Sequence, residues 1–339
     1  MTTEHHGPLP TVPERERRRA HLSRAQPAAR THSAGSTGLQ RRDSTKTWSI
    51  IRRVTAGASE PFETRPLLTR PVPASGERLP VIGLGTWQTF DVGSDETERR
   101  PLEDVLAAFA ELGGTLIDSS PMYGRAEAVV GDLTARLALP ARSFIATKVW
   151  TTGKDAGLRQ MEESMGRLRS SSIDLMQVHN LVDVETHLET LGAWKAAGRI
   201  RYVGVTHYTA SGHEAVGRVL ERHPVDFVQI NYSVAEREAE RRILPLARER
   251  RIAVLVNRPF AEGGLLRAVR SRPLPAWAAD LDCQAWSQLL LKFVISHPAV
   301  TCAIPATSSA AHVRENMHAG RGAMPDENGR ARIAAEWTR

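Results

Sequence analysis

Eight short stretches dominated by apolar and β-branched residues recur along the chain, and they are its clearest structural signal. Each stretch is bounded by Gly, Pro or polar residues, which is typical of strands that are buried on both faces. In chain order they occupy residues 80–86, 115–120, 143–150, 173–180, 201–208, 227–233, 252–260 and 301–307. The pattern therefore predicts eight strands.

Between these stretches lie segments whose apolar residues repeat every three or four positions, as in amphipathic helices. The clearest are residues 101–114, 126–139, 155–169 and 184–199. Strands that alternate with helices predict a parallel sheet covered by helices. Eight such units in about 270 residues match a closed (β/α)8 barrel better than an open doubly wound sheet. No G-x-G-x-x-G motif opens a helix, which disfavours a Rossmann-type domain.

The chain ahead of the first strand divides at about residue 65. Residues 66–86 predict a short hairpin, with a turn at Ser75 and Gly76, that leads into the first strand. Residues 1–65 are rich in Pro, Ser, Thr, Ala and Arg and lack apolar periodicity, so we predict a disordered basic extension, followed by one barrel domain over 66–339. An organelle transit peptide and a start codon chosen in error are alternatives for the extension.

Charge is distributed unevenly along the chain. Residues 1–80 hold 14 Lys and Arg against 7 Asp and Glu, which accounts for the whole net charge of +7. The barrel itself is therefore neutral, and we expect no nucleic-acid partner for it. A nucleic-acid role for the basic extension is a separate hypothesis.

The composition predicts a soluble globular protein with a substantial core. Hydrophobic residues make up 41% and charged residues 24%, and no run of 18 apolar residues could span a membrane. The two cysteines, Cys283 and Cys302, are too few for a disulfide framework and have no metal-ligand spacing. We expect a cytoplasmic protein, a monomer or weak oligomer, with no metal and no membrane partner.

Polar residues stand where several of the predicted strands end, which is where barrel enzymes carry out their chemistry. Asp118, Lys148 and His179 end the second, third and fourth strands, and Tyr123 follows Asp118 by five residues. One such residue alone would be explained as a satisfied core group, whereas three on neighbouring strands indicate a site. A Lys ammonium lowers the pKa of a nearby phenol from its usual value near 10, and a neutral His can donate to a substrate oxygen. The set suits protonation of a carbonyl oxygen.

These residues, in this order and on these strands, resemble the catalytic tetrad of the aldo-keto reductase superfamily, over about residues 67–317. The resemblance implies that Tyr123 is the general acid and base, that Asp118 and Lys148 tune it, and that His179 orients the carbonyl. It also implies an NAD(P)H cofactor that delivers hydride. Trp87 and Trp150 stand at strand ends and are expected to wall a substrate pocket together with His179 and Asn180, since such pockets usually have apolar walls; a packing role is the alternative for the two tryptophans.

The same resemblance implies a set of cofactor contacts. Those expected are Gly85, Thr86, Trp87, Asp118, Thr206, His207, Gln229, Arg258, Phe260, Thr307, Ser308, His312, Glu315 and Asn316. For Arg258, a role in pinning a loop is the alternative. The chain departs from the family at His207, where Asn is usual, at Asn257, where an aromatic residue is usual, and near Ala306, where a Lys or Arg often binds the 2′-phosphate. NADPH is expected as in the family, and NADH is a second candidate.

Two hypotheses for function follow. The first is an NAD(P)H-dependent reductase of aldehydes or ketones, whose small carbonyl substrate is selected by loop shape, above all by the insert at 262–284. The second is a cofactor-binding sensor or partner subunit with little turnover, motivated by His207 and Asn257. The complete tetrad argues for the reductase.

Overall fold

The computed structural model of the protein describes residues 65–139 and 143–338. Residues 1–64 lie outside the described ranges, so the disorder predicted for residues 1–65 stays a prediction. The predicted eight-stranded parallel sheet is confirmed, with the order β10-β9-β8-β7-β6-β5-β4-β3. Each predicted stretch coincides with one strand, although β7 begins one residue before its stretch: β3 (Leu84–Gly85), β4 (Leu116–Asp118), β5 (Phe144–Val149), β6 (Ile173–His179), β7 (Ile200–Thr206), β8 (Phe227–Asn231), β9 (Ala253–Asn257) and β10 (Cys302–Ala303).

The sheet closes between its first and last strands. Two parallel bridges, Ile82 to Ala303 and Gly85 to Ala306, join the two edges, so the strands form a (β/α)8 barrel as predicted. The closure is tight, because a Cβ atom at Gly85 would lie 2.7 Å from the carbonyl oxygen of Ile304. A glycine is required at this position for the two strand ends to approach each other.

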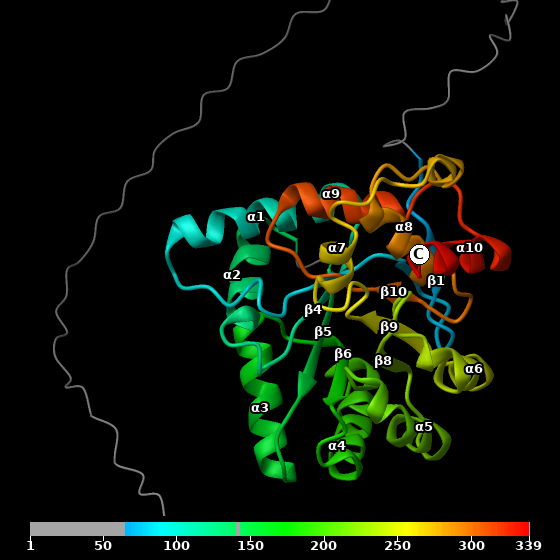
Figure 1. Cartoon of the computed structure of the whole chain (residues 1–339). Coiled ribbons are helices and arrows are strands. Elements are labelled where there is room, and N and C mark those ends of the chain that lie inside the picture. The colour runs from blue at the N-terminus through cyan, green and yellow to red at the C-terminus, as the bar shows by residue number, and fades with distance from the viewer. Residues whose placement is uncertain (1–64, 140–142, 339) are drawn as a thin grey trace, which may run out of the picture. The chain divides into compact units, whose positions relative to one another are not determined.

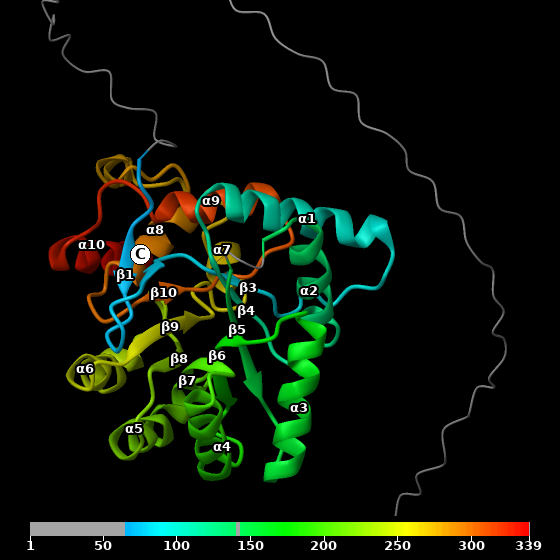
Figure 2. The ribbon, with the colours of Figure 1, turned by 180° about the vertical axis from the view of Figure 1, so that it is seen from behind.

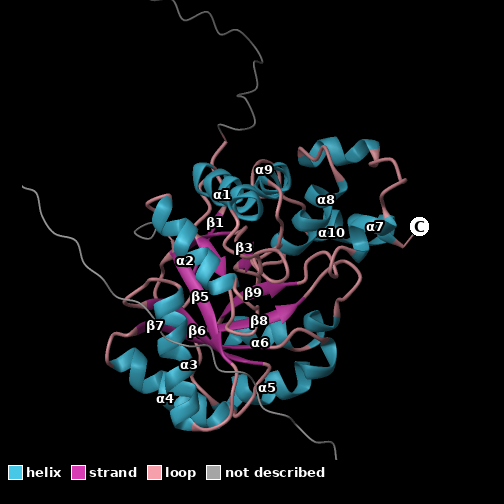
Figure 3. Cartoon of the chain, turned by 90° about the vertical axis from the view of Figure 1, so that its left-hand side faces the viewer, coloured by secondary structure: helices cyan, strands magenta, loops and turns pink. Residues whose placement is uncertain are grey.

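Helices surround the barrel on the outside. The strands lie at the centre of Figure 1, the view from behind in Figure 2 shows the same ring of helices, and Figure 3 shows the strands in magenta enclosed by helices in cyan. The helices are α1 (Glu96–Glu111), α2 (Ala126–Arg136), α3 (Lys154–Arg167), α4 (Val184–Ala196), η3 (Ala210–Gly212), α5 (His213–Arg222), η4 (Glu238–Arg241), α6 (Ile243–Glu249), α7 (Gly264–Ala268), η5 (Ala276–Leu281), α8 (Trp286–Ile295), α9 (Ala310–Ala319) and α10 (Glu327–Trp337). The four helical segments named from the sequence correspond to α1–α4, and the insert at 262–284 contains α7 and η5.

Helix α1 illustrates how the sequence sets these elements. Its N-cap residue is Asp95, whose side chain accepts a hydrogen bond from the backbone N–H of Thr97 at 2.8 Å. Its apolar face, which includes Leu102, Val105 and Phe109, is buried. The spacing of three and four residues that predicted the helix is thus the spacing that packs it on the barrel.

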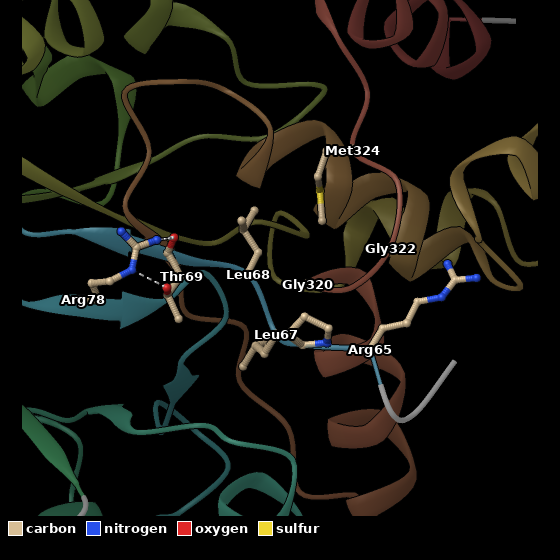
Figure 4. Close-up of a pocket in the computed structure, with 9 residues that line it drawn as sticks. Arg65, Leu67, Leu68, Thr69, Arg78, Gly320, Gly322 and Met324 are labelled. Carbon is tan, nitrogen blue, oxygen red and sulfur yellow. Dashed lines mark hydrogen bonds between the residues drawn. The ribbon is translucent and has the colours of Figure 1, made fainter. Parts of the chain in front are cut away.

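The predicted N-terminal hairpin is also confirmed and closes one end of the barrel. Strands β1 (Thr69–Pro71) and β2 (Arg78–Pro80) pair antiparallel, and Arg78 binds the hydroxyl and the carbonyl of Thr69 at 2.7 and 2.6 Å (Figure 4). Val72 and Leu79 pack into the barrel interior. The apolar cluster that they join contains Leu116, Phe144, Ala146, Leu175, Tyr202, Phe227, Ala253, Leu255, Cys302 and Ile304.

Candidate active site

Side chains alternate between the inside and the outside of the barrel along each strand. At the C-terminal end of the strands, opposite the hairpin, several of the inward side chains are polar. On β6, for example, Leu175 belongs to the apolar cluster beside the hairpin, and Gln177 and His179 follow on the same face toward the C-terminal end. The same alternation leads from Leu116 to Asp118 on β4. The other inward polar groups at this level are Lys148 on β5 and Gln229 on β8, and both are buried.

Asp118 and Lys148 form a buried ion pair at this end, which we call the barrel mouth. Lys148 Nζ lies 2.7 Å from Asp118 Oδ2 and also donates to the Ser119 carbonyl oxygen at 2.6 Å. The second carboxylate oxygen, Oδ1, accepts hydrogen bonds from Gln177 at 3.2 Å and from Gln229 at 2.8 Å. Both oxygens of the carboxylate therefore have donors, as a buried charge requires.

This ion pair determines the charge of Lys148. Burial acts to lower the pKa of the ammonium, but the attraction of Asp118, that of Tyr123 and the hydrogen bonds to both together outweigh burial, so the pKa lies above its usual value. Lys148 is fully buried and nevertheless remains a cation at neutral pH.

Tyr123 stands beside this cation on the loop between β4 and α2. Its backbone N–H donates to the Ser120 carbonyl oxygen at 3.0 Å, which closes a turn, and Lys148 Nζ lies 4.9 Å from the centre of the phenol ring. Gly124 completes the turn with φ of +60°, and a Cβ there would lie 2.3 Å from the Asp91 carboxylate. The turn glycine that follows the tyrosine is therefore needed for both its backbone angle and the space beside it.

The pKa of Tyr123 differs from the expectation drawn from its neighbours. Burial raises this pKa more than the positive charge of Lys148 lowers it, and the negative charge of Asp118 adds to the increase. The expected lowering by Lys148 is present as one contribution, but the net direction is upward, because a phenolate at this position would be poorly solvated. Tyr123 therefore carries its proton at neutral pH.

His179 ends β6 beside the phenol. The two ring centres are 6.0 Å apart with an interplanar angle of 82°, and the ring of Trp150 lies 6.3 Å away on another side. Burial, then the charges of Lys148 and His207, lower the pKa of His179 to about 2. The imidazole is therefore neutral over the physiological range.

Four large apolar side chains are exposed at the barrel mouth. Trp87, Met122, Trp150 and Tyr208 are 38%, 38%, 42% and 49% exposed, and they are the exposed large hydrophobic residues of the described chain. Each lies on a loop that follows a strand of the barrel: β3, β4, β5 and β7 respectively. An apolar rim around a few buried polar groups is typical of a small-molecule site.

Several of the predicted cofactor contacts on the strands are hydrogen-bonded to one another. Thr86 donates to the Asp118 carbonyl oxygen at 2.9 Å, and the side chains of Thr206 and Gln229 lie 3.4 Å apart. Gly85 and Trp87 flank Thr86 at the end of β3, Asn180 follows His179, and Phe260 is packed in the core. His207 is held through its carbonyl oxygen, which accepts from Asn257 at 3.2 Å.

Arg258 has contacts on three loops. It donates to the Tyr208 carbonyl oxygen at 2.8 Å, and its guanidinium lies 3.3 Å from Glu262 and 3.7 Å from Glu236. These contacts match the loop-pinning alternative. Its predicted role in cofactor binding stays a prediction.

The last predicted cofactor contacts, Thr307, Ser308, His312, Glu315 and Asn316, lie just before α9 and within it. Ser309 caps this helix by accepting from the His312 backbone N–H, and the side chains of Thr307 and His312 lie 3.5 Å apart. Ser308 and His312 are exposed. Glu315 accepts a hydrogen bond from Ser287, and Asn316 is buried.

Sequence reasoning missed four residues at the mouth. Gln177 binds Asp118, and Ser120 lies 3.2 Å from His179 Nδ1. Met122 and Tyr208 complete the apolar rim. The alternation on β6 places Gln177 on the same strand face as His179 and could have identified it, whereas the others lie on loops with no periodic signal.

Two hollows on the described surface lie away from these groups. One, of about 440 Å³, is bordered by residues 65–69, Arg78, Gly320, Gly322 and Met324 beside the hairpin (Figure 4). The other, of about 660 Å³, lies between α4 and the end of α5. Among the described residues, no group of three or more His, Cys, Asp or Glu is arranged to hold a metal ion. No helix in those ranges is both long and apolar enough to cross a membrane.

Comparison with known proteins gives a consistent result. The model of the aldo/keto reductase family matches residues 81–331. The methylglyoxal reductase YeaE of Escherichia coli is 31% identical over 245 residues, which cover 70% of this chain and 84% of that protein. A solved aldo/keto reductase from Klebsiella pneumoniae in complex with NADP and acetate is 28% identical, with a TM-score of 0.66, over 77% of this chain and 93% of the other. A second structure from the same organism, in complex with NADPH, is 27% identical, with a TM-score of 0.66, over 80% and 96% of the two chains.

Proposed function

This chain belongs to the aldo/keto reductase family, and on that premise we propose that it is an NADPH-dependent oxidoreductase that reduces aldehydes and ketones to alcohols. The observation that carries the proposal is the convergence at the barrel mouth. A protonated phenol lies beside a buried ammonium, 4.9 Å from ring centre to Nζ, and beside a neutral imidazole, 6.0 Å between ring centres. These groups suit a carbonyl oxygen that gains a proton.

Each side chain has a distinct role in this proposal. His179 donates a hydrogen bond to the carbonyl oxygen and orients it, since the ring is neutral and cannot compete as a strong acid. Tyr123 donates its proton to that oxygen. The positive charge of Lys148 stabilises the phenolate that remains, and Asp118 keeps Lys148 charged and in place.

The residues around the mouth fit a nicotinamide dinucleotide. Helix α9 has ten residues, and Ser308 and His312 at its start are exposed, which suits phosphate groups. Gln229 binds Asp118, and the Thr206 hydroxyl and the His207 backbone N–H both contact Gln229. These three residues would hold the carboxamide. When bound, NADPH supplies the hydride that reduces the carbonyl carbon.

NADH is the alternative cofactor. Residues 306–309 contain no Lys or Arg to bind a 2′-phosphate, although the solved relatives from Klebsiella pneumoniae bind NADP and NADPH. Titration of NADPH against NADH by fluorescence quenching measures this preference directly. We expect NADPH to bind more tightly, and equal dissociation constants would show that the chain does not read the 2′-phosphate.

The apolar rim points to substrates with an apolar or aromatic group beside the carbonyl. Trp87, which follows β3, and Trp150, which follows β5, are both exposed and belong to this rim. Because the relative from Escherichia coli is named a methylglyoxal reductase, methylglyoxal and nitrobenzaldehyde make a useful pair of test substrates. We expect a lower KM for nitrobenzaldehyde, and Trp150→Ala should remove that difference.

The decisive test is Tyr123→Phe, which removes only the phenolic oxygen. We expect NADPH oxidation with nitrobenzaldehyde to fall by about 10²- to 10⁴-fold, the usual contribution of a positioned acid. The dissociation constant for NADPH should stay unchanged. Tyr208→Phe, which makes the same change at the exposed rim, should retain turnover. Full activity in Tyr123→Phe would reject Tyr123 as the proton donor.

A cofactor-binding sensor remains the second candidate. Two of the residues at which the chain departs from its family are joined by a hydrogen bond, which the Asn257 side chain donates to the His207 carbonyl oxygen. Tight NADPH binding without turnover on a broad panel of carbonyl compounds would favour the sensor.

A further inference from the structure

Ser120 is a buried residue between Asp118 and Tyr123 that no assigned role explains. It is fully buried, and its Oγ lies 3.2 Å from Nδ1 of His179. The backbone N–H of Met122 donates to the same Oγ at 3.5 Å. Ser120 therefore contacts one edge of the imidazole and is itself held by the turn that carries Tyr123.

We propose that Ser120 is a positioning residue that holds His179 in the tautomer with the proton on Nε2. In this state Nδ1 accepts a hydrogen bond from the Ser120 hydroxyl, and Nε2–H can donate to the ligand. The catalytic consequence rests on the proposed reductase function, whereas the tautomer itself does not.

The donors and acceptors available to Ser120 and His179 favour this tautomer. A neutral imidazole has one donor nitrogen and one acceptor nitrogen, and a serine hydroxyl has one proton to donate. Ser120 Oγ accepts from Met122, and among the described residues the acceptor within its reach is His179 Nδ1. With the proton on Nδ1, the Ser120 hydroxyl would be left as a buried donor without a partner, which is unfavourable.

The other ring nitrogen is free to meet a ligand. Within the described ranges, Nε2 of His179 has no hydrogen-bond partner, and it is not one of the buried polar atoms that lack one. The rings of Tyr123 and Trp150 lie against the imidazole at 6.0 and 6.3 Å and restrict its rotation. A donor on Nε2 would therefore be available to a ligand, and the proposed ligand atom is the carbonyl oxygen that Tyr123 protonates.

The positively charged form of the His179 imidazole is disfavoured relative to the two neutral tautomers. The charge of Lys148 and the neighbouring His207 both disfavour a positive imidazole, and burial does so more strongly. The choice at neutral pH is therefore between the two neutral tautomers, and Ser120 biases that choice.

The neighbouring Ser119 supplies a matched control. It is equally buried, but its hydroxyl oxygen lies 3.0 Å from that of Thr86 and has no hydrogen bond to His179 among the described residues. Ser119→Ala and Ser120→Ala thus remove the same atom from adjacent positions, and only the second removes the partner of Nδ1.

The test is nitrogen-15 NMR of the full chain labelled at histidine, without substrate or cofactor. The chain has 12 histidines, so the His179 signals are assigned by their loss in His179→Gln. We expect a protonated Nε2 and an unprotonated Nδ1 in the wild type and in Ser119→Ala. Ser120→Ala should give a mixture of tautomers, and Ser120→Thr, which keeps the hydroxyl, should restore the wild-type pattern. A proton on Nδ1 in the wild type, or an unchanged tautomer in Ser120→Ala, would overturn the proposal.

Kinetics separates this proposal from the proposed function. For Ser120→Ala we expect kcat to fall about 10- to 100-fold, the range seen when the partner of a functional histidine is removed, with the NADPH dissociation constant unchanged. If the wild type reduces no carbonyl compound, the reductase proposal fails while the NMR result still decides the tautomer. If kcat is unaffected although the tautomer shifts, Ser120 has no positioning role in catalysis.

Discussion

The two ends of the barrel interior are filled by side chains of opposite polarity, although the same strands supply both. At the hairpin end, Phe144, Tyr202 and Phe227 pack with ring centres 5.3 to 6.0 Å apart. At the mouth, Asp118 is bound by Lys148 and by two glutamines. Two residues along a strand are enough to change from one environment to the other.

The difference shows how the fold separates stability from chemistry. The apolar end needs only volume and shape, so its side chains stabilise the barrel wherever they fit. The polar end requires every partner, because an unpaired charge in a buried position is costly. We therefore expect changes at the hairpin end to affect stability alone and changes at the mouth to affect both stability and turnover.

The largest effect is expected for Lys148→Met. The Asp118 carboxylate would remain buried without its cation, so the free energy of unfolding should fall by about 3–5 kcal/mol. Turnover of nitrobenzaldehyde should fall by at least about 10²-fold, because the charge beside Tyr123 is lost. Urea denaturation and NADPH oxidation measure the two effects.

Its control is Lys154→Met, at an exposed lysine that lies 4.0 Å from Glu189. The change in unfolding free energy should stay within about 0.5 kcal/mol. The double variant Asp118→Asn with Lys148→Met should recover part of the lost stability but not the turnover. Equal destabilisation by Lys148→Met and Lys154→Met would contradict the expectation that Lys148 stabilises the fold by pairing with the buried Asp118.

A smaller effect, on stability alone, is expected for Leu175→Ala. Leu175 is fully buried in the apolar cluster, so the cavity left behind should lower the free energy of unfolding by about 2–5 kcal/mol. Turnover per folded molecule should be unchanged. Gln177→Ala, two residues further on β6, should cost about 1 kcal/mol and should reduce turnover, since Gln177 binds Asp118. Equal losses of turnover in Leu175→Ala and Gln177→Ala would contradict the expected difference between the two ends of the barrel.

The fold could be predicted because parallel strands buried on both faces leave a strong local signal. Each of the eight apolar stretches coincides with a strand, and the repeats of three and four residues correspond to α1–α4. Strand lengths were not predictable. β3 and β10 have only two residues each, because the barrel closes there through isolated bridges between distant segments.

The site could be predicted where its residues end strands or, as for Tyr123, lie at a fixed offset from a strand end. Asp118, Lys148 and His179 were identified because charged or imidazole side chains follow apolar runs. Ser120 could not be found, since its partner is 59 positions away and is brought near by the barrel alone. The net direction of the Tyr123 pKa was wrong, because the sequence shows the nearby charge but not the burial that outweighs it.

A last effect is expected in the pH dependence of stability, where one histidine from each end of the barrel can be compared. In the unfolded chain His179 takes up a proton near its ordinary pKa of 6.5, whereas in the folded chain its pKa is lowered to about 2. Between these values the unfolded state binds more protons, so stability falls as the pH falls, by about 1.4 kcal/mol per pH unit. His297, whose carbonyl oxygen binds Arg70 of the hairpin, has a pKa lowered to about 4, which limits its contribution to the window between 6.5 and 4.

Urea denaturation of His179→Gln and His297→Gln between pH 6.5 and 3 separates the two ends. Glutamine at 179 keeps an oxygen that can accept from Ser120, so the fold should persist. We expect His179→Gln to flatten the acid dependence over the whole range, and His297→Gln to flatten it only above about pH 4. A wild type and a His179→Gln variant with parallel stability curves would mean that the imidazole at the mouth takes up a proton as readily in the folded chain as in the unfolded one. The mouth would then lack the low-polarity surroundings on which its neutral histidine and its protonated phenol both depend.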